Sequence, residues 1–493
     1  MNNVENKMVV GATWMVSLKF IERGIGFVST LILARLLMPE DFGLVAMAMA
    51  VYAFIEIGGQ FGFDFALIRE QNATRRLYDS AWTLSVGYGI FSACALAVLA
   101  PIASAFFTEP RLEAVIYALA VVSLVAGFEN IGIVNFRKEF LFKKDFQFIF
   151  LKKIISFFVT VSLAIVFRSY WALVAGILVS RMSGVILSYV LHPFRPKIDF
   201  SKIRELFNFS KWILLSRVTG FFGDRGPHFL IGRFLDPAFL GIYSVGREIS
   251  TLPTTELIYP IMRAVFPGYA AIAHDRQQLA RSFLNVQGML VTIAFPAGIG
   301  IVMVADPFVR FLLGPNWLEA VPVIQVLGIY GAITVFQATN NSVFNSLGVP
   351  VWGTVLKLLE IVILLPAMFI VLRLGYGVQG VVWSILGAQL LVIPAGIFLI
   401  SRMLNIGFLD RLRVAWRPVI ASLVMSGVLY AFAKSPFLHG SGAGLSLAIC
   451  VPAGVVVFSS SLLFFWLLAG KPQGPEATIL EQIQKSSFGR VRL

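Results

Sequence analysis

Long apolar runs, each followed by a short polar connection, make up almost the whole of this 493-residue chain. An α-helix needs about 20 apolar residues to cross a hydrocarbon layer that is about 30 Å thick. Runs of that length recur at about 10–36, 42–68, 80–107, 112–134, 146–167, 171–191, 211–234, 240–266, 283–304, 320–346, 353–373, 378–402, 414–433 and 444–469. This pattern predicts an all-α polytopic membrane protein with about 14 transmembrane helices, because a β-barrel would instead show short alternating segments.

Basic residues gather in alternate connections, and this asymmetry indicates how the chain is oriented. The basic connections lie near 69–76, 137–144, 195–204, 276–281 and 402–417, followed by the segment after 470. Because cytoplasmic loops are enriched in Lys and Arg, we expect both termini in the cytoplasm. The net charge of +14 comes mostly from these connections, so it indicates topology rather than binding of nucleic acid.

A long polar connection divides the chain near its middle. Residues 192–210 begin with prolines and continue as a basic amphipathic stretch, so we expect a cytoplasmic linker that lies along the membrane surface. We predict an N-terminal lobe of six helices at 1–191 and a C-terminal lobe of six helices at 211–402. Two further helices at 403–470 and a cytoplasmic tail at 471–493 complete the chain.

A weak internal repeat supports this division. When the chain is shifted by 198 residues, identical residues coincide: Trp14 with Trp212, Pro39 with Pro237, and Gly43 with Gly241. Six intervening helices preserve the direction of the chain. The two lobes are therefore expected to be parallel repeats, related by a pseudo-two-fold axis along the membrane normal, with a central cavity between them.

The first apolar run carries three charged residues near its middle: Lys19, Glu22 and Arg23. A charged side chain at mid-membrane costs about 2.5–3.5 kcal/mol on insertion scales, so three that faced lipid would cost about 8 kcal/mol or more. Positions i, i+3 and i+4 share one side of a helix, so all three side chains can instead face a polar cavity. The alternative that the sequence leaves open is a self-neutralising pair, Glu22–Arg23 or Lys19–Glu22, that only holds two helices together.

Charged residues recur in the apolar runs of the second half. They comprise the cations Arg217, Arg225 and Arg247 and the carboxylates Asp224, Glu248 and Glu360. Together with Lys19 and Arg23, the three arginines are candidates for binding a phosphate or an acidic sugar, because Lys supplies a point charge and Arg a bidentate fork. Glu22 and the three carboxylates are candidates for charge balance or for coupling to H⁺ or Na⁺. For each Arg, an ion pair with a nearby carboxylate is the alternative.

Signatures of enzymes and of ATP-driven pumps are missing from the sequence. It contains no G-x₄-G-K-[ST] motif, no H-E-x-x-H motif and no Cys/His cluster, and its two cysteines lie within apolar runs. The first residues lack the pattern of a cleaved signal peptide, so the first helix is expected to direct insertion. We therefore expect a secondary transporter that uses no cofactor.

Four segments resemble a known family. They are LARLLMPEDFGLVAMAM at 33–49, VFPGYAAIAHDRQQLARSF at 265–283, GPNWLEAVPVIQVLGIYG at 314–331 and NNSVFNSLG at 340–348. The segments resemble polysaccharide repeat-unit flippases of the Wzx type, particularly the colanic-acid-like exporters of lipopolysaccharide and exopolysaccharide synthesis. These exporters belong to the multidrug/oligosaccharidyl-lipid/polysaccharide (MOP) superfamily.

The resemblance implies a fold and a substrate. It implies two lobes of six helices, two more C-terminal helices, and a V-shaped cavity that opens alternately to each face of a bacterial inner membrane. The implied substrate is an undecaprenyl-diphosphate-linked oligosaccharide, flipped from the cytoplasmic to the periplasmic leaflet for surface polysaccharide synthesis. A polysaccharide polymerase and a chain-length regulator are the implied protein partners. The family has no catalytic motif to carry over, so the candidate residues rest on charge alone.

Three other functions remain open from the sequence. A lipid II flippase would share the superfamily and the membrane topology. A polymerase or ligase acting on the same lipid-linked glycan would need a larger outward loop than the short connections provide. An antiporter of cationic drugs would carry mainly acidic clusters in its helices, whereas cations prevail here.

Overall fold

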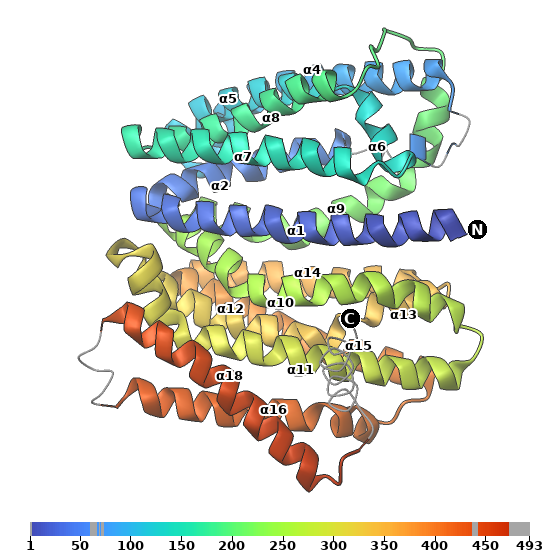
Figure 1. Cartoon of the computed structure of the whole chain (residues 1–493). Coiled ribbons are helices and arrows are strands. Elements are labelled where there is room, and N and C mark those ends of the chain that lie inside the picture. Colours follow the sequence, from blue (N-terminus) through green and yellow to red (C-terminus); the bar gives the residue numbers. More distant parts are fainter. Residues whose placement is uncertain (1, 60–66, 69, 71–72, 436–441, 473–493) are drawn as a thin grey trace, which may run out of the picture. The chain divides into compact units, whose positions relative to one another are not determined.

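The computed structural model describes residues 2–59, 67–68, 70, 73–435 and 442–472, and the described part is built from helices (Figure 1). The first helices are α1 (Asn2–Leu36), α2 (Pro39–Glu56), α4 (Arg75–Phe107), α5 (Arg111–Gly127), α6 (Val134–Lys138), α7 (Phe142–Phe167), α8 (Trp171–Leu191), α9 (Ile203–Phe234) and α10 (Pro237–Ala271). They are followed by α11 (Arg276–Phe308), α12 (Ala320–Thr334), α13 (Asn340–Ser346), α14 (Val351–Arg373), α15 (Gly377–Leu404), α16 (Phe408–Ala433) and α18 (Ala443–Leu468). Within α1 and α9, the side chains of 2–13, 15–16 and 203–217 lie outside the described part.

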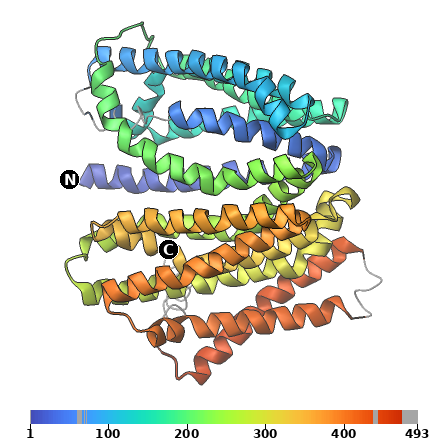
Figure 2. The same cartoon turned by 180° about the vertical axis from the view of Figure 1, so that it is seen from behind.

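The helices form two compact units, Met1–Ser244 and Val245–Leu493. In the first unit, α4 packs along α5 and α7 packs along α8, while α1 lies against α7 (Figures 1 and 2). Helix α5 also contacts α8 and α2. Helix α9 contacts both α2 and α4. The predicted lobe boundaries stay a prediction, and most of the predicted tail lies outside the described residues.

The second unit is arranged around α11. This helix contacts α12, α16 and α18, while α14 pairs with α15 and α16 with α18. Helix α12 ends at Thr334, and a short 3₁₀ turn, Val335–Gln337, separates it from α13. Buried apolar side chains of α11 and α12 fill the centre of the unit, including Leu290, Val291 and Ala332.

The apolar length of the helices confirms the predicted class of polytopic, all-α membrane protein. In the described part, nine helices are long and apolar enough to cross a bilayer, or ten if the bent pair Arg111–Gly127 and Ile131–Lys138 is one span. These numbers are consistent with the predicted count of about 14 without establishing it. Helices α1, α9 and α10, which carry most of the predicted site residues, are not among the nine.

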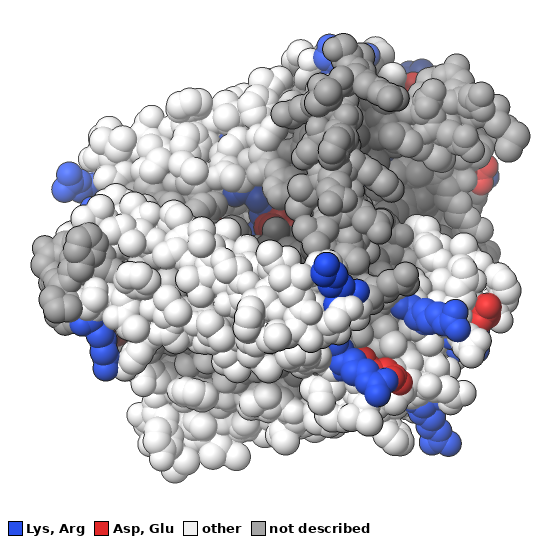
Figure 3. All heavy atoms as spheres, turned by 60° about the horizontal axis from the view of Figure 1, so that its bottom comes forward, with Lys and Arg blue, Asp and Glu red and all other residues white. Residues whose placement is uncertain are grey.

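The flank of the second unit that carries α16 and α18 shows how such helices meet lipid. Figure 3 shows a broad uncharged surface there, with most visible Lys and Arg side chains toward its two ends. Exposed apolar side chains such as Leu423 in α16 and Val455 in α18 form part of this surface. An uncharged belt between charged ends is what a hydrocarbon layer requires.

Two glycines of the predicted repeat allow a close crossing inside the first unit. A Cβ added to Gly43, in α2, would stand 1.7 Å from the carbonyl oxygen of Pro237. A Cβ added to Gly241, in α10, would stand 1.9 Å from the carbonyl oxygen of Pro39. Each helix thus presses its glycine against the backbone of the other, which no larger residue permits at this separation.

Candidate functional site

Two of the three predicted charged residues of α1, Lys19 and Glu22, form an ion pair with each other. Lys19 Nζ lies 3.2 Å from Glu22 Oε2, with side chains that are 49% and 35% exposed. Arg23, one residue further on, is exposed. The Lys19–Glu22 pair that the sequence left open is therefore present, formed within α1 itself, and both charged groups remain accessible. A role for these residues in binding stays a prediction.

The charged residues of α9 lie near its middle and differ in exposure. Asp224 is exposed and Arg225 is half-buried, whereas the side chain of Arg217 lies outside the described part. His228, one turn further along, is buried with its ring 5.5 Å from the ring of Tyr243. A role for Asp224, Arg225 and Arg217 in binding stays a prediction.

The remaining predicted residues belong to the second unit. Arg247 and Glu248 are half-buried in α10. Glu360 pairs with Lys357 one turn away on α14, with 3.1 Å between Oε2 and Nζ. Glu360 therefore has an ion-pair partner, Lys357, at the i,i+3 spacing that brings two side chains together on a helix.

A cavity in the first unit contains three cations that the sequence analysis did not single out. It has a volume of about 520 Å³, and Lys152 and Lys153 of α7 and Arg181 of α8 line it. Arg181 is the central residue of the 21-residue α8. Both lysines lie within about 4 Å of the midpoint of α7 along its axis, at 1.5 Å per residue. All three charges therefore stand near the middle of membrane-spanning helices.

Hydroxyl groups share this cavity with the cations. Ser156, Thr160, Ser180 and Ser29 contribute to its lining, and the Thr160 hydroxyl donates to the carbonyl of Ser156 at 2.7 Å. The Ser156 hydroxyl likewise donates to the carbonyl of Gly176, so these two hydroxyls offer acceptor lone pairs to sugar hydroxyls, while the cations supply donors for phosphate oxygens. We call this space, lined by Lys152, Lys153, Arg181 and these hydroxyls, the cationic cavity.

The cationic cavity adjoins the face of α1 that carries the predicted charges. Ser29 and Leu33 line it, and a Cβ on Gly26 would stand 3.8 Å from Lys153 Nζ. Glu22, Gly26, Ser29 and Leu33 follow one another at i+4, i+3 and i+4 spacing, so they lie on one side of the helix. The predicted α1 face therefore continues into the cavity that α7 and α8 form.

A second polar cavity of about 250 Å³ lies on the other side of Arg181, which lines both spaces. Glu56 and Glu129 supply carboxylates to it, and the Ser123 hydroxyl donates to Glu56 Oε1 at 3.5 Å. The Tyr52 side chain lies within electrostatic reach of both Glu56 and Arg181. Arg181 thus has carboxylate on one side and the lysines of the cationic cavity on the other.

Gly184 of α8 allows a cation and a carboxylate to approach each other. A Cβ at this position would stand 3.1 Å from Glu129 Oε2 and 3.1 Å from Lys152 Cδ. The three cations therefore face two carboxylates, and the balance is one excess positive charge before Arg137, which also lines the second cavity, is counted. Within the described residues, no three His, Cys, Asp or Glu side chains gather as metal ligands.

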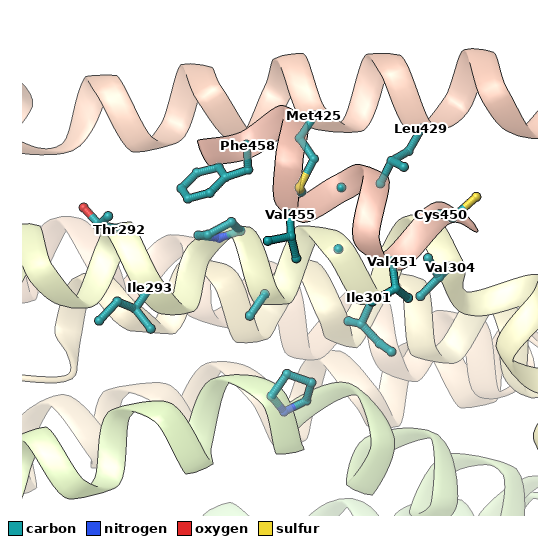
Figure 4. A pocket seen from close by; sticks show the side chains of 15 residues that line it. Thr292, Ile293, Ile301, Val304, Met425, Leu429, Cys450, Val451, Val455 and Phe458 are labelled. Atoms are coloured by element: carbon teal, nitrogen blue, oxygen red, sulfur yellow. The ribbon is translucent and has the colours of Figure 1, made fainter. Parts of the chain in front are cut away.

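The second unit contains a cavity of the opposite character. It has a volume of about 450 Å³, and apolar side chains of α11, α16 and α18 make up most of its wall. Figure 4 shows Ile301, Val304, Met425, Leu429 and Phe458 around this space. Gly454 of α18 also lines it, and a Cβ added there would stand 3.3 Å from Leu429 Cδ1 of α16. We call it the apolar cavity.

The connection after α8 is bound to the first unit instead of lying free. Side chains of α4 accept three of its backbone N–H groups: Asp79 Oδ1 from Lys197 (2.9 Å), Thr83 Oγ1 from Asp199 (2.9 Å) and Ser80 Oγ from Lys202 (3.2 Å). His192 Nδ1 accepts the N–H of Phe194 at 3.1 Å. Burial lowers the pKa of His192, because the charged imidazolium would lose water.

Comparison with known proteins identifies relatives over nearly the whole length. Residues 32–322 match the family described as "Polysaccharide biosynthesis protein". The succinoglycan biosynthesis transport protein ExoT of Rhizobium meliloti (strain 1021) is 26% identical over 91% of both chains. The teichuronic acid biosynthesis protein TuaB of Bacillus subtilis (strain 168) is 26% identical over 96% of this chain and 98% of its own. The lipopolysaccharide biosynthesis protein WzxC of Escherichia coli (strain K12) is 24% identical over 67% of this chain and 68% of its own.

Solved structures share the fold at low identity. The lipid II flippase MurJ in an inward closed conformation superposes with a TM-score of 0.72 and 12% identity, covering 92% of this chain and 98% of that one. An inward-facing multidrug resistance MATE family transporter of the MOP superfamily has a TM-score of 0.62 and 14% identity, covering 80% and 98%. The family match agrees with the expected resemblance to polysaccharide biosynthesis proteins, and the solved structures show that the chain shares the fold of MurJ and of a MATE family transporter. The chain is a multi-pass membrane protein, and it belongs to the polysaccharide biosynthesis protein family.

Proposed function

We propose that this protein flips undecaprenyl-diphosphate-linked oligosaccharide repeat units from the cytoplasmic to the periplasmic leaflet of a bacterial inner membrane. The repeat units would then be assembled into a surface polysaccharide such as an exopolysaccharide or O-antigen. Transport would proceed by alternating access, with both termini in the cytoplasm. A polymerase and a chain-length regulator would act on the flipped product.

The cationic cavity is the observation that carries this proposal. Three cations near mid-membrane cost about 8 kcal/mol or more to insert on biological scales. Because this cost is high, ionisable residues at this depth are rare and usually have a function. A diphosphate that crosses the same depth needs compensating charge for the same reason. Lys152, Lys153 and Arg181 provide that charge beside hydroxyls suited to sugar hydroxyls.

Two further features support a lipid-linked glycan as the substrate. The apolar cavity offers hydrocarbon contacts of the kind that a prenyl chain requires, and Val451 and Phe458 are among its lining residues. The names of relatives connect them to succinoglycan, teichuronic acid and lipopolysaccharide biosynthesis.

The charged residues expected from the sequence complete the proposed path. Lys19, Arg23, Arg217, Arg225 and Arg247 would contact the diphosphate or acidic sugars during the cycle. The carboxylates Glu22, Asp224, Glu248 and Glu360 would balance charge or bind the coupling ion, H⁺ or Na⁺. Because Lys19 and Glu22 already form a pair, the substrate would compete with Glu22 for the ammonium group.

A reconstituted flipping assay tests the proposal. Purified protein in liposomes should move a fluorescent undecaprenyl-diphosphate oligosaccharide between leaflets. The variant Lys152→Gln/Lys153→Gln/Arg181→Gln should lose at least roughly tenfold of that rate, since each lost charged hydrogen bond is worth about 1.5–3 kcal/mol. The matched control is Lys143→Gln, an exposed lysine in the first turn of the same α7. Equal rates in the triple variant and the control, or no flipping by the native protein, would reject the proposal.

A further inference from the structure

Arg411, in the first turns of α16, is a buried cation without a hydrogen-bond partner among the described residues. The residue is 7% exposed, and its Nε, Nη1 and Nη2 atoms are each buried and unbonded. The guanidinium carbon lies 5.0 Å from the ring centre of Phe283 in α11. A cation–π contact offsets part of the lost hydration, but it leaves the five N–H donors of the guanidinium unsatisfied. A buried charge in this state calls for an anion.

The neighbouring carboxylate does not supply that anion. Asp410 accepts the backbone N–H of Gly407 at 3.1 Å, which caps the start of α16. It also pairs with Arg413, with 3.6 Å between Oδ1 and Nη1. Asp410 is therefore engaged with the helix end and with the exposed Arg413, while Arg411 turns toward α11.

The depth of Arg411 matches the edge of the hydrocarbon layer. Helix α16 has 26 residues, and Arg411 precedes its midpoint by about 14 Å at 1.5 Å per residue. Half of a typical hydrocarbon core is about 15 Å thick. Side chains of a helix lean toward its N-terminus, which is here the end nearer the headgroups. A long Arg side chain at this depth can reach a lipid phosphate by a change of rotamer.

The residues around Arg411 on α16 are those of a lipid-facing surface. Phe408, Leu409 and Leu412 are exposed and apolar. Arg402, at the end of α15, and Arg413 add positive charge at the same end of the unit. Apolar side chains for acyl groups thus flank a buried cation and two exposed ones, at the end that the charge pattern assigns to the cytoplasm.

We propose that Arg411 anchors a binding site for the phosphate group of an anionic lipid at this end of the second unit. The guanidinium binds the phosphate through its fork, and the acyl chains lie against Phe408, Leu409 and Leu412. This lipid is a bound regulator or structural ligand, distinct from the transported glycan. Free phosphate presents the same chemistry to the guanidinium, so the test must separate the two sources.

Thermal unfolding of the full-length protein in a neutral detergent provides the test. The variant Arg411→Met removes the charge and keeps the length of the side chain, and Arg413→Met makes the same change at the exposed neighbour. Without lipid, Arg411→Met should melt at a higher temperature than the native protein, because a buried uncompensated charge has been removed. Added phosphatidylglycerol should raise the melting temperature of the native protein and of Arg413→Met, with little effect on Arg411→Met. In native mass spectrometry, phosphatidylglycerol retention should fall roughly tenfold in Arg411→Met.

Each outcome decides the proposal. Stabilisation by phosphatidylglycerol that depends on Arg411 and is absent with inorganic phosphate supports a lipid site. Stabilisation by inorganic phosphate that depends on Arg411 to the same degree overturns the lipid assignment in favour of a free anion. If Arg411→Met melts lower in every condition and keeps the lipid response, the guanidinium is satisfied inside the protein, and the site is refuted. Should Arg411→Met fail to purify as a single species, Arg411→Lys, which retains charge but lacks the fork, replaces it in the same comparison.

Discussion

Replacement of Gly43 by alanine should force apart two helices that are in backbone contact. Gly43 lies in the first turns of α2, and Gly241 occupies the same place in α10. An added Cβ would stand 1.7 Å from the carbonyl oxygen of Pro237 at the first position and 1.9 Å from that of Pro39 at the second. Both obstacles are backbone atoms, so no change of side-chain rotamer removes the clash.

The size of the effect follows from this geometry. An ordinary contact of a Cβ begins at 3.4 Å, so the Pro237 oxygen must retreat by about 1.7 Å. Overpacking of this kind costs about 1–3 kcal/mol, and the lower entropy of an unfolded chain with Ala in place of Gly returns about 0.4–1 kcal/mol. We therefore expect a net loss of about 1–2 kcal/mol for either variant. The double variant should lose less than the sum, because the first Cβ already opens the crossing for the second.

Thermal unfolding in detergent and flipping in liposomes measure this prediction together. The matched controls are Gly24→Ala in α1 and Gly220→Ala in α9, since nothing lies within 4 Å of an added Cβ at either position. The controls should keep or slightly raise the melting temperature, as Ala favours a helix by up to about 1 kcal/mol over Gly. Gly43→Ala and Gly241→Ala should lower it and slow flipping.

Two results would refute the reasoning. One is a melting temperature of Gly43→Ala that equals that of the Gly24→Ala control. The other is full additivity of the losses in Gly43→Ala and Gly241→Ala, which would mean that the two glycines do not share one crossing. Either result would mean that the repeated glycines are not needed for the packing of α2 against α10.

Three other features yield predictions. Asp79→Ala should leave the N–H of Lys197 without its acceptor and lower stability by about 1–3 kcal/mol in thermal unfolding, whereas Asp79→Asn, which keeps an acceptor, should lose less. His192 has a lowered pKa and accepts the N–H of Phe194 in its neutral form, so the stability it confers is present above its ordinary pKa of about 6.5 and is lost as the pH falls below it. Limited proteolysis of the segment after α8 should therefore accelerate from pH 7 to pH 5 in the native protein, with a smaller change in His192→Asn. Gly454→Phe should fill the apolar cavity and reduce flipping without loss of the folded protein on size-exclusion chromatography, an outcome that an unaltered flipping rate would contradict.

The fold class could be predicted from sequence because its determinants are local. A run of about 20 apolar residues specifies a spanning helix by itself, whatever its neighbours are. The helix starts at Pro39 and Pro237 could also be recognised from the sequence, because Pro at the first helical position and Gly four residues later recur in both halves. Their mutual contact required the structure, because residues 198 positions apart leave no local sign of contact.

The cationic cavity was missed for a physical reason. Lys152 and Lys153 are flanked by apolar residues on both sides, so these two charges at the centre of a 26-residue helix hardly alter the hydropathy of its apolar stretch. Arg181, at the centre of α8, was the stronger signal, and the cost of a mid-membrane cation should have marked it. The partners could not be read locally, because Glu56 and Arg181 are 125 residues apart in the chain. By contrast, the pairs Lys19–Glu22 and Lys357–Glu360 lie one turn apart, where the sequence alone makes pairing visible.

The carboxylates beside the cationic cavity suggest how tight binding is reconciled with release. A cavity with three uncompensated cations would hold a diphosphate strongly, and it would also be costly to keep empty in a membrane. Glu129 approaches Lys152 at Gly184, and Glu56 shares the second cavity with Arg181, so internal anions lower both costs. Under the proposed function, an arriving phosphate would exchange with these carboxylates for the same cations, and the net gain on binding would be only the difference between the two sets of contacts. A transporter needs that small difference, because a site that binds its substrate much more tightly than its own counter-charges would hold it through the cycle.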